Sequence, residues 1–182
     1  MNTPAVSIII PVLNEADGIV QALERLQGFR AQGAEIIVVD GGSNDDTAEC
    51  ARSLADCVTT SRRGRALQMN AGAALASGDV LLFLHADTLL PSSALDLVRT
   101  VVGSGSCWGR FDVHIEGAIR GLGMVAFMMN WRSRLTGIAT GDQAIFVTRE
   151  AFQRSGGFPA IPLMEDIVFS ALMRKEAWPV CL

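Results

Sequence analysis

The sequence lacks the long apolar runs and targeting segments that mark membrane and secreted proteins. No window of its 182 residues offers about 18 continuous apolar residues, so we expect no transmembrane helix. The first apolar stretch, VSIIIPVL, is short and has no basic segment before it, so we predict no signal peptide. Internal repeats, linkers and low-complexity segments are also missing. The length then predicts a single domain over residues 1–182.

The sequence has little cysteine, and none of it is arranged as a metal or redox motif. The four cysteines are Cys50, Cys57, Cys107 and Cys181, and no pair has CxxC spacing. This excludes the usual zinc and dithiol signatures. We expect free thiols in a reducing cytoplasm, with the protein either free there or peripheral to the inner membrane.

The sequence has no excess of positive charge. Its formal net charge is −4 and its pI is about 5.1, which argues against general nucleic-acid binding. A local basic pocket for phosphate groups remains compatible with this composition.

In the first half of the chain, short apolar runs alternate with helical patterns. The predicted strands cover residues 6–13, 35–40, 57–61 and 80–86. The predicted helices cover residues 16–28, 47–54, 65–76 and 91–102. Strands that are apolar on both faces and separated by helices predict an α/β fold, with a mostly parallel sheet covered on both sides. We take residues 1–104 as the first half of the domain.

The second half, residues 105–182, has a more mixed pattern. Residues 107–115 alternate and favour an antiparallel strand, whereas residues 140–150 read as a turn, a strand and a helix start. Residues 165–176 form an amphipathic helical pattern headed by two acids. This half is predicted to be a smaller part with a mixed arrangement of strands and helices.

Polar residues follow each predicted strand of the first half. The segments at the strand ends are Pro11–Glu15, Asp40–Ser43, Ser61–Arg65 and His85–Asp87. Ligands of parallel α/β sheets bind beyond the carboxyl ends of the strands. The pattern therefore predicts a ligand site at this edge.

His85 and Asp87 end the predicted fourth strand. Side chains two positions apart on an extended segment point the same way, so both could face one ligand. The two could share a divalent ion that bridges phosphate oxygens. Mg²⁺ prefers oxygen ligands and imidazole favours Mn²⁺. In the alternative, Asp87 caps the helix near Pro91 and His85 is only hydrogen-bonded nearby.

Asp40 precedes two glycines that permit a tight turn and close approach of a ligand. Its carboxylate could accept hydrogen bonds from a nucleobase or ribose. The alternative is a helix cap, although Ser43 and Asn44 fit that role better.

Two other polar clusters lie at predicted strand ends. Arg62, Arg63 and Arg65 carry the side chain suited to phosphate recognition, although at least one of them fits a solvated loop equally well. Asn14 and Glu15 could contact a ribose, or Asn14 could cap the following helix.

Glu165 and Asp166 open the last predicted helix. Carboxylates in a first turn gain from the helix dipole, which is a structural explanation for both. The functional alternative is a general base that takes a proton from an attacking hydroxyl. Adjacent helical residues diverge, so we expect one of the two to face the reaction.

The run at residues 121–131 is apolar and contains several methionines. One interpretation is that this run packs in the core. The alternative is that it forms a hydrophobic acceptor groove or contacts a membrane surface, which Arg132 and Arg134 beside it would favour.

Several stretches, taken in order, resemble the family 2 glycosyltransferases of the GT-A fold. They are SIIIPVLNE, IIVVDGGSNDDT, RGRALQMNAGA, GDVLLFLHADT, GDQAIFV and GGFP with MEDI. HADTLLP, WGRFDV, RSRLTG and PLMEDI further resemble a bacterial subgroup of arsenosugar-biosynthesis or radical-SAM-associated transferases. The resemblance covers nearly the whole chain and implies a GT-A-type, Rossmann-like sheet.

The resemblance implies that residues 1–104 are the nucleotide-binding half and residues 105–182 the acceptor and catalytic half. Pro11, Glu15 and Asp40 would hold the nucleoside. Arg65, with Arg63, would lie near the base or the diphosphate.

The resemblance also implies the reacting groups. His85 and Asp87 would occupy the DxD position with a bound Mn²⁺ or Mg²⁺, where Asp87 is the metal contact and His85 replaces the first Asp. Asp166 would be the catalytic base. The residues implied to line the donor sugar and acceptor pocket are Gly141, Asp142 and Gln143.

The implied activity is an inverting, metal-dependent transfer of a sugar from a nucleotide diphosphate, most often a UDP-sugar, to an acceptor hydroxyl. One alternative is nucleotidyl transfer, but PVLNEADG lacks the Gly-rich, Lys-containing signature of such enzymes. Another is a non-catalytic nucleotide-sugar-binding or scaffold protein. Family members continue past WPVCL with an Arg/Trp segment that closes over the donor, so we expect a C-terminal segment to be missing here.

Overall fold

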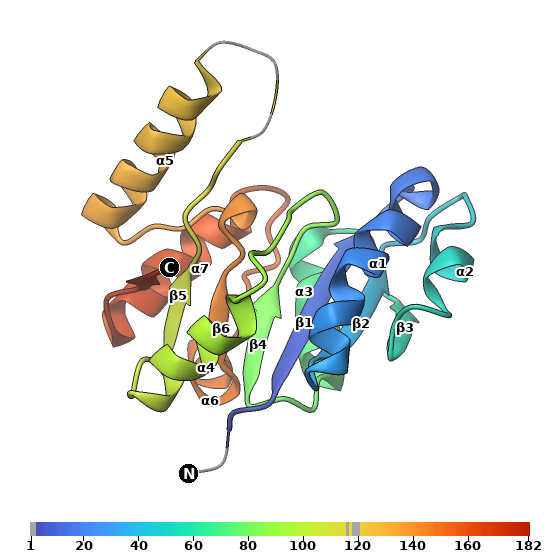
Figure 1. Cartoon of the computed structure of the whole chain (residues 1–182), viewed down its shortest axis with the longest axis horizontal. Coiled ribbons are helices and arrows are strands. Elements are labelled where there is room, and N and C mark those ends of the chain that lie inside the picture. The colour runs from blue at the N-terminus through green and yellow to red at the C-terminus, as the bar shows by residue number, and fades with distance from the viewer. Residues whose placement is uncertain (1–2, 116, 118–120) are drawn as a thin grey trace.

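A single mixed sheet organises the protein. The computed structural model describes residues 3–115, 117 and 121–182, and within these residues seven strands form one sheet (Figure 1). In chain order the strands are β1 (Val6–Val12), β2 (Glu35–Asp40), β3 (Cys57–Thr60), β4 (Val80–Phe83), β5 (Trp108–Arg110), β6 (Phe146–Thr148) and β7 (Val180–Cys181). Their order across the sheet is β3-β2-β1-β4-β6-β5-β7.

The sheet is parallel over the strands β1 to β4 and mixed beyond β4. β1 pairs in parallel with β2 and β4, and β2 pairs in parallel with β3. β6 runs antiparallel to both β4 and β5, and β7 pairs in parallel with β5. This confirms the predicted α/β fold with a mostly parallel sheet.

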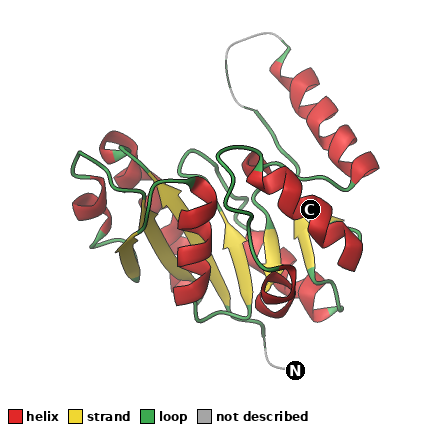
Figure 2. Cartoon of the chain, turned by 180° about the vertical axis from the view of Figure 1, so that it is seen from behind, coloured by secondary structure: helices red, strands yellow, loops and turns green. Residues whose placement is uncertain are grey.

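Helices cover both faces of the sheet (Figure 2). The helices are α1 (Ala16–Ala31), α2 (Thr47–Ala51), α3 (Arg65–Leu75), α4 (Ala94–Gly103), α5 (Leu122–Thr136), α6 (Arg149–Ser155) and α7 (Glu165–Glu176), with a 3₁₀ turn η1 at Gly141–Gln143. Ile8 and Ile10 of β1 belong to the core cluster under α1, α2 and α4, whereas Ile9 packs with α3, α6 and α7. Successive strand residues point to opposite faces, so both faces need apolar residues and the strands read as continuous apolar runs.

The end of α1 differs from the prediction. Gly28 does not close the helix, which continues to Ala31 and ends before Gly33, whose φ is +86°. Glycine within a helix costs about 1 kcal/mol relative to alanine. Here the buried Leu26 and Phe29 on either side hold the helix against the sheet.

Several elements are shorter than predicted, among them α2, which ends at Ala51 rather than near residue 54. β4 ends at Phe83 rather than at residue 86, and α4 begins at Ala94 rather than near residue 91. The predicted strand at 107–115 is regular only over Trp108–Arg110.

α5 stands apart from the other helices. Figures 1 and 2 show it beyond the edge of the sheet, on the side where the parallel strands β1 and β4 have their carboxyl ends. Among the described residues, no helix is both long enough and apolar enough to cross a bilayer.

Candidate functional site

Asp40 shapes the loop that follows β2. Its side chain is 4% exposed, and Oδ2 accepts hydrogen bonds from the backbone N–H groups of Gly42 and Ser43, each at 3.0 Å. The Ser43 hydroxyl donates to the other carboxylate oxygen. Gly42 has φ +85°, which the tight turn requires. Asp40 thus fixes the backbone at the predicted nucleoside site.

The loop after β1 is pinned to the loop after β2. Asn14, at φ +55°, donates its N–H to Ser43 Oγ at 2.8 Å, and its side-chain oxygen accepts from the N–H of Asn44 at 2.9 Å. The N–H of Glu15 donates to Thr47 Oγ1 at 2.8 Å, and the Glu15 side chain is exposed. Asn14 therefore joins two loops instead of capping α1, and the Glu15 carboxylate remains open to a ligand.

Gln68 of α3 ties the ends of β1 and β2 together, a role that the sequence interpretation missed. Its buried Nε2 donates to the carbonyl oxygens of Val12 at 2.8 Å and Val39 at 2.9 Å. Pro11, half-buried, pairs with Val39 in the sheet. A Cβ on Gly41 would lie 3.0 Å from the Gln68 side chain. The sequence does contain a signal for this role, because a single amide on the apolar face of a helix must find hydrogen-bond partners when it is buried.

The structure separates the three arginines that follow β3. Arg62 and Arg63 are exposed in the loop before α3. Arg65, the first residue of α3, lines a narrow cavity at the sheet edge, and its Nε lies 3.8 Å from Glu165 Oε1.

The predicted geometry of His85 and Asp87 is wrong. β4 ends at Phe83, and the N–H of Thr88 donates to the His85 carbonyl at 3.1 Å, so the chain turns here. His85 lines the narrow cavity, whereas Asp87 lines a separate groove of about 880 Å³ together with Asp142. The turn places the His85 imidazole on the narrow cavity and the Asp87 carboxylate on the groove.

The His85 ring packs over Gly141. A Cβ on Gly141 would lie 2.4 Å from His85 Cε1 and 2.6 Å from Nε2, so only glycine leaves room for the ring. His85 Nδ1 lies 3.5 Å from Asp142 Oδ1. Burial lowers the pKa of His85, and the Arg65 charge lowers it further, while nearby carboxylates oppose both effects. Because the resulting pKa lies below the ordinary value of 6.5, the imidazole is neutral near pH 7.

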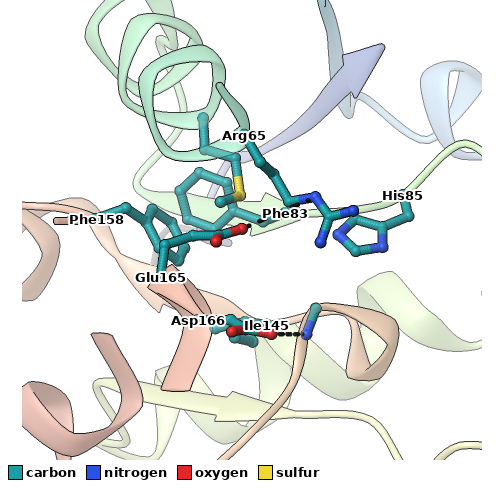
Figure 3. A pocket seen from close by; sticks show the side chains of 9 residues that line it. Arg65, Phe83, His85, Ile145, Phe158, Glu165 and Asp166 are labelled. Atoms are coloured by element: carbon teal, nitrogen blue, oxygen red, sulfur yellow. Dashed lines mark hydrogen bonds and ion pairs between the residues drawn. The ribbon is translucent and has the colours of Figure 1, made fainter. Parts of the chain in front are cut away.

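Two adjacent acids of α7 enter the same cavity (Figure 3). Glu165 is 3% exposed, and among the described residues its Oε1 has no hydrogen-bond partner. Asp166 is half-buried, and its Oδ2 accepts the N–H of Gly141 at 2.6 Å while Oδ1 accepts the N–H of Ile167 at 2.8 Å. Both acids therefore line the cavity, and the expectation that one of them faces the reaction stays a prediction.

The narrow cavity is small and has apolar walls. Its volume is about 10 Å³, roughly the room that one water molecule needs. Met69, Phe83, Ile145 and Phe158 form much of its wall. Charges there are poorly screened by solvent, and the space admits one hydroxyl rather than a sugar ring.

Gln143 has a structural position. Its side chain is fully buried, with Oε1 accepting the N–H of Thr140 at 3.1 Å and Nε2 donating to Asn130 Oδ1 at 3.4 Å. Of the GDQ motif, Gly141 and Asp142 lie at the site. Gln143 instead stabilises the backbone that presents them, which corrects its predicted place in the pocket lining.

Asp87 and Asp142 supply part of what a Mn²⁺ or Mg²⁺ site needs. Within the described part of the chain, no three His, Cys, Asp or Glu side chains form a cation site. Asp87 and Asp142 are exposed carboxylates on one groove, and one or two carboxylates completed by phosphate oxygens suit Mg²⁺. His85 lines the narrow cavity, but its Nδ1 lies 3.5 Å from Asp142 Oδ1, so Asp142 connects the imidazole to the groove that Asp87 lines.

Comparison with known proteins agrees with the fold. A sequence model of the glycosyl transferase family 2 matches residues 7–116. An uncharacterized glycosyltransferase of Mycobacterium tuberculosis is 32% identical over 168 residues, which are 86% of this chain and 63% of that protein. The chain thus spans less than two thirds of this relative.

Two solved structures share the fold. A mannosyltransferase from Pyrobaculum calidifontis in complex with GDP-Man and Mn²⁺ has a TM-score of 0.75 at 24% identity, covering 100% of this chain and 55% of that one. Staphylococcus aureus TarS 1-349 in complex with UDP-GlcNAc has a TM-score of 0.72 at 19% identity, covering 93% and 53%. These likenesses show the GT-A fold.

Proposed function

Because the chain belongs to the glycosyl transferase family 2, we propose that it transfers a sugar from a nucleotide diphosphate to an acceptor hydroxyl, with inversion at the anomeric carbon. One observation carries the proposal. A Cβ on Gly141 would lie 2.6 Å from His85 Nε2 and 3.6 Å from Asp166 Oδ2, so the neutral imidazole and the Asp166 carboxylate lie close together beside Gly141.

Asp166 is the proposed general base. Two backbone N–H groups fix the orientation of its carboxylate, and an acceptor hydroxyl at the mouth of the cavity is within reach of Oδ2. The hydroxyl loses its proton to Asp166 as its oxygen attacks the anomeric carbon. The apolar wall keeps bulk water from competing as the acceptor.

The donor lies along the sheet edge in this proposal. The pinned loops at Asn14, Glu15 and Asp40 hold the nucleoside, and Arg65 with Arg63 meets the diphosphate. Residues 1–104 then form the donor half and residues 105–182 the acceptor half.

We further propose that Asp87 and Asp142 hold a Mn²⁺ or Mg²⁺ ion when the donor binds. Such an ion supplies positive charge that stabilises the departing diphosphate. In this proposal the neutral imidazole of His85 forms hydrogen bonds at the acceptor position, and its part as a metal ligand beside Asp142 stays a prediction. The Mn²⁺ in the Pyrobaculum calidifontis complex supports the assignment.

The donor is a UDP- or GDP-sugar in this proposal, since the two similar structures hold UDP-GlcNAc and GDP-Man. The arsenosugar or radical-SAM-associated subgroup stays a prediction from the motifs. A cytoplasmic location also stays a prediction.

Calorimetric titration of UDP and GDP, each with and without Mn²⁺, tests the donor site. We expect Mn²⁺-dependent binding of one nucleotide that Asp87→Ala abolishes and that Asp96→Ala, an exposed first-turn acid of α4, leaves intact. If neither nucleotide binds under any condition, the protein has no donor site and the proposal fails. The scaffold alternative would then explain the chain better.

A further inference from the structure

α5 is held to the body mainly by polar contacts. Arg134 Nη2 donates to Asp112 Oδ2 at 2.5 Å, and Asp112 also pairs with the fully buried Arg110. Asn130 Oδ1 accepts the N–H of Val113 at 2.8 Å, and its Nδ2 donates to the Val113 carbonyl at 2.9 Å. The helix therefore does not rely on its large apolar side chains for attachment.

Those apolar side chains face away from the body. The inward side of α5 buries Ala126 and Ser133, seven positions apart on one line of the helix. A second line, here called the α5 stripe, consists of Met124, Met128, Trp131 and Leu135. Its members are 64%, 63%, 56% and 62% exposed. Their spacing of four, three and four residues keeps them on one side of the helix, opposite the buried line.

An aromatic pair strengthens this surface. Phe127 is 61% exposed and stacks on Trp131, with ring centroids 6.3 Å apart and planes at 14°. Figure 1 shows that α5 is held clear of the sheet, so nothing in the described part of the chain covers the α5 stripe. A contiguous exposed apolar surface of this kind marks an interaction site.

The charges beside the stripe select the partner. Arg132 and Arg134 lie on opposite sides of it, because they stand one residue to either side of the buried Ser133. α5 contains no Asp or Glu. Arg134 is paired with Asp112, so a fitting partner is apolar where it meets the stripe and negative along the flank that carries Arg132.

A second copy of α5 fits less well. The stripe has the spacing of a coiled-coil seam, and the two arginines hold the flanking positions where partner helices usually place opposite charges. Two copies would bring arginines together with no acid of α5 to pair them.

We propose that α5 docks the protein on the surface of a membrane that contains anionic phospholipid. The α5 stripe and Phe127 enter the boundary between headgroups and acyl chains, where Trp and Phe are favoured. Arg132, which forms no ion pair among the described residues, extends along its flank to the lipid phosphates, while Arg134 stays paired with Asp112.

Docking through α5 would also orient the candidate site. α5 lies on the side of the strand carboxyl ends, and its Met129 lines the same groove as Asp87 and Asp142. The groove would then lie one helix away from the membrane surface. The inference does not rest on the proposed sugar transfer, because vesicle binding is measured without any donor.

Vesicle flotation tests the apolar part of the proposal. We expect the protein to float with mixed vesicles of phosphatidylcholine and phosphatidylglycerol, and much less with phosphatidylcholine alone. Leu135→Ser should weaken binding about fivefold or more, the effect expected for removing one large side chain from the interface. Leu75→Ser, at a side chain 52% exposed on α3, is the matched control and should bind normally.

Charge reversal tests the flanks. Arg132→Glu should weaken binding to the mixed vesicles by about fivefold or more, the weight of one basic side chain near an anionic surface. Arg25→Glu on α1 makes the same change of net charge at an exposed position and should have little effect. Circular dichroism melting curves confirm that each variant is folded.

Tryptophan fluorescence locates the contact. In a Trp178→Phe background, the emission of Trp131 should shift to the blue with mixed vesicles and be quenched by brominated lipid, since Trp108 is fully buried. The proposal is overturned if folded protein does not bind the mixed vesicles, or if Leu135→Ser and Leu75→Ser bind alike. A reversible dimer without vesicle binding, lost in Leu135→Ser, would assign the surface to a second copy instead.

Discussion

Arg65 Nε lies 3.8 Å from Glu165 Oε1, and it is the cation beside a carboxylate that is only 3% exposed. The two residues come from the first turns of α3 and α7, so the contact joins the two halves of the chain at the candidate site. A buried carboxylate that loses its charge partner is costly, because its desolvation is no longer compensated.

Removing the Arg65 charge should therefore destabilise the fold. We expect Arg65→Met to lower the free energy of unfolding by about 1–2 kcal/mol, since Arg65 itself is half exposed and solvent screens part of the interaction. Urea denaturation measures the change. Arg63→Met, two residues earlier and exposed, should be neutral. Equal stability of the two variants would show that Glu165 does not depend on Arg65.

The packing of His85 on Gly141 predicts a second effect. Gly141→Ala places a methyl group 2.4 Å from the His85 ring, which must move away from Asp166. We expect a loss of about 1–3 kcal/mol of stability and a strong loss of sugar transfer. Ring NMR resonances report the displacement directly, because the chain has only one other histidine, His114.

Gly28→Ala is the matched control for that substitution. Nothing lies within 4 Å of a Cβ at position 28, in the interior of α1. Alanine should raise stability there by about 0.5–1 kcal/mol and leave the His85 resonances unchanged. A normal His85 spectrum in Gly141→Ala would contradict the packing.

The attachment of α5 should weaken in acid. Burial raises the pKa of Asp112, but hydrogen bonds and charges from Arg134 and Arg110 outweigh it and hold the pKa below the ordinary value of 3.8. A depressed pKa stabilises the fold above the unfolded value, and this contribution is lost as the pH falls through the lower, folded value. Hydrogen exchange of the α5 amides should therefore accelerate below about pH 4.

Asp112→Asn tests the same attachment at neutral pH. The variant should show fast α5 exchange at pH 7 and little further acceleration in acid. If α5 exchange in the wild type is independent of pH after correction for the intrinsic rate, Asp112 does not anchor the helix.

The sheet could be predicted from the sequence because the apolar runs of the strands match the burial of both faces of the sheet. The runs around Ile8–Ile10 and Ile36–Val39 are apolar on both faces, and this is what a covered parallel sheet requires. The helices between them carry apolar residues at helical spacing, so both the order and the type of these elements could be predicted.

The details of the site depend on contacts that local sequence does not record. Nothing within LLFLHADT states that the strand ends at Phe83, because the turn is set by where β4 stops pairing with β1 and β6. Asp142 and Gln143 are adjacent and both polar, yet one is exposed and the other fully buried beside α5. Which of them faces a ligand is decided by the packing of η1 against Asn130.

The most direct test is turnover by Asp166→Asn. Release of nucleoside diphosphate from a panel of UDP- and GDP-sugars, followed with Mn²⁺ present, should find a donor that the wild type consumes. Asp166→Asn should reduce that rate by at least about 100-fold while the nucleotide affinity stays unchanged, since only the base is lost. Asp96→Asn should retain full activity. A fully active Asp166→Asn variant would contradict the account, because the carboxylate over Gly141 would then have no part in the transfer.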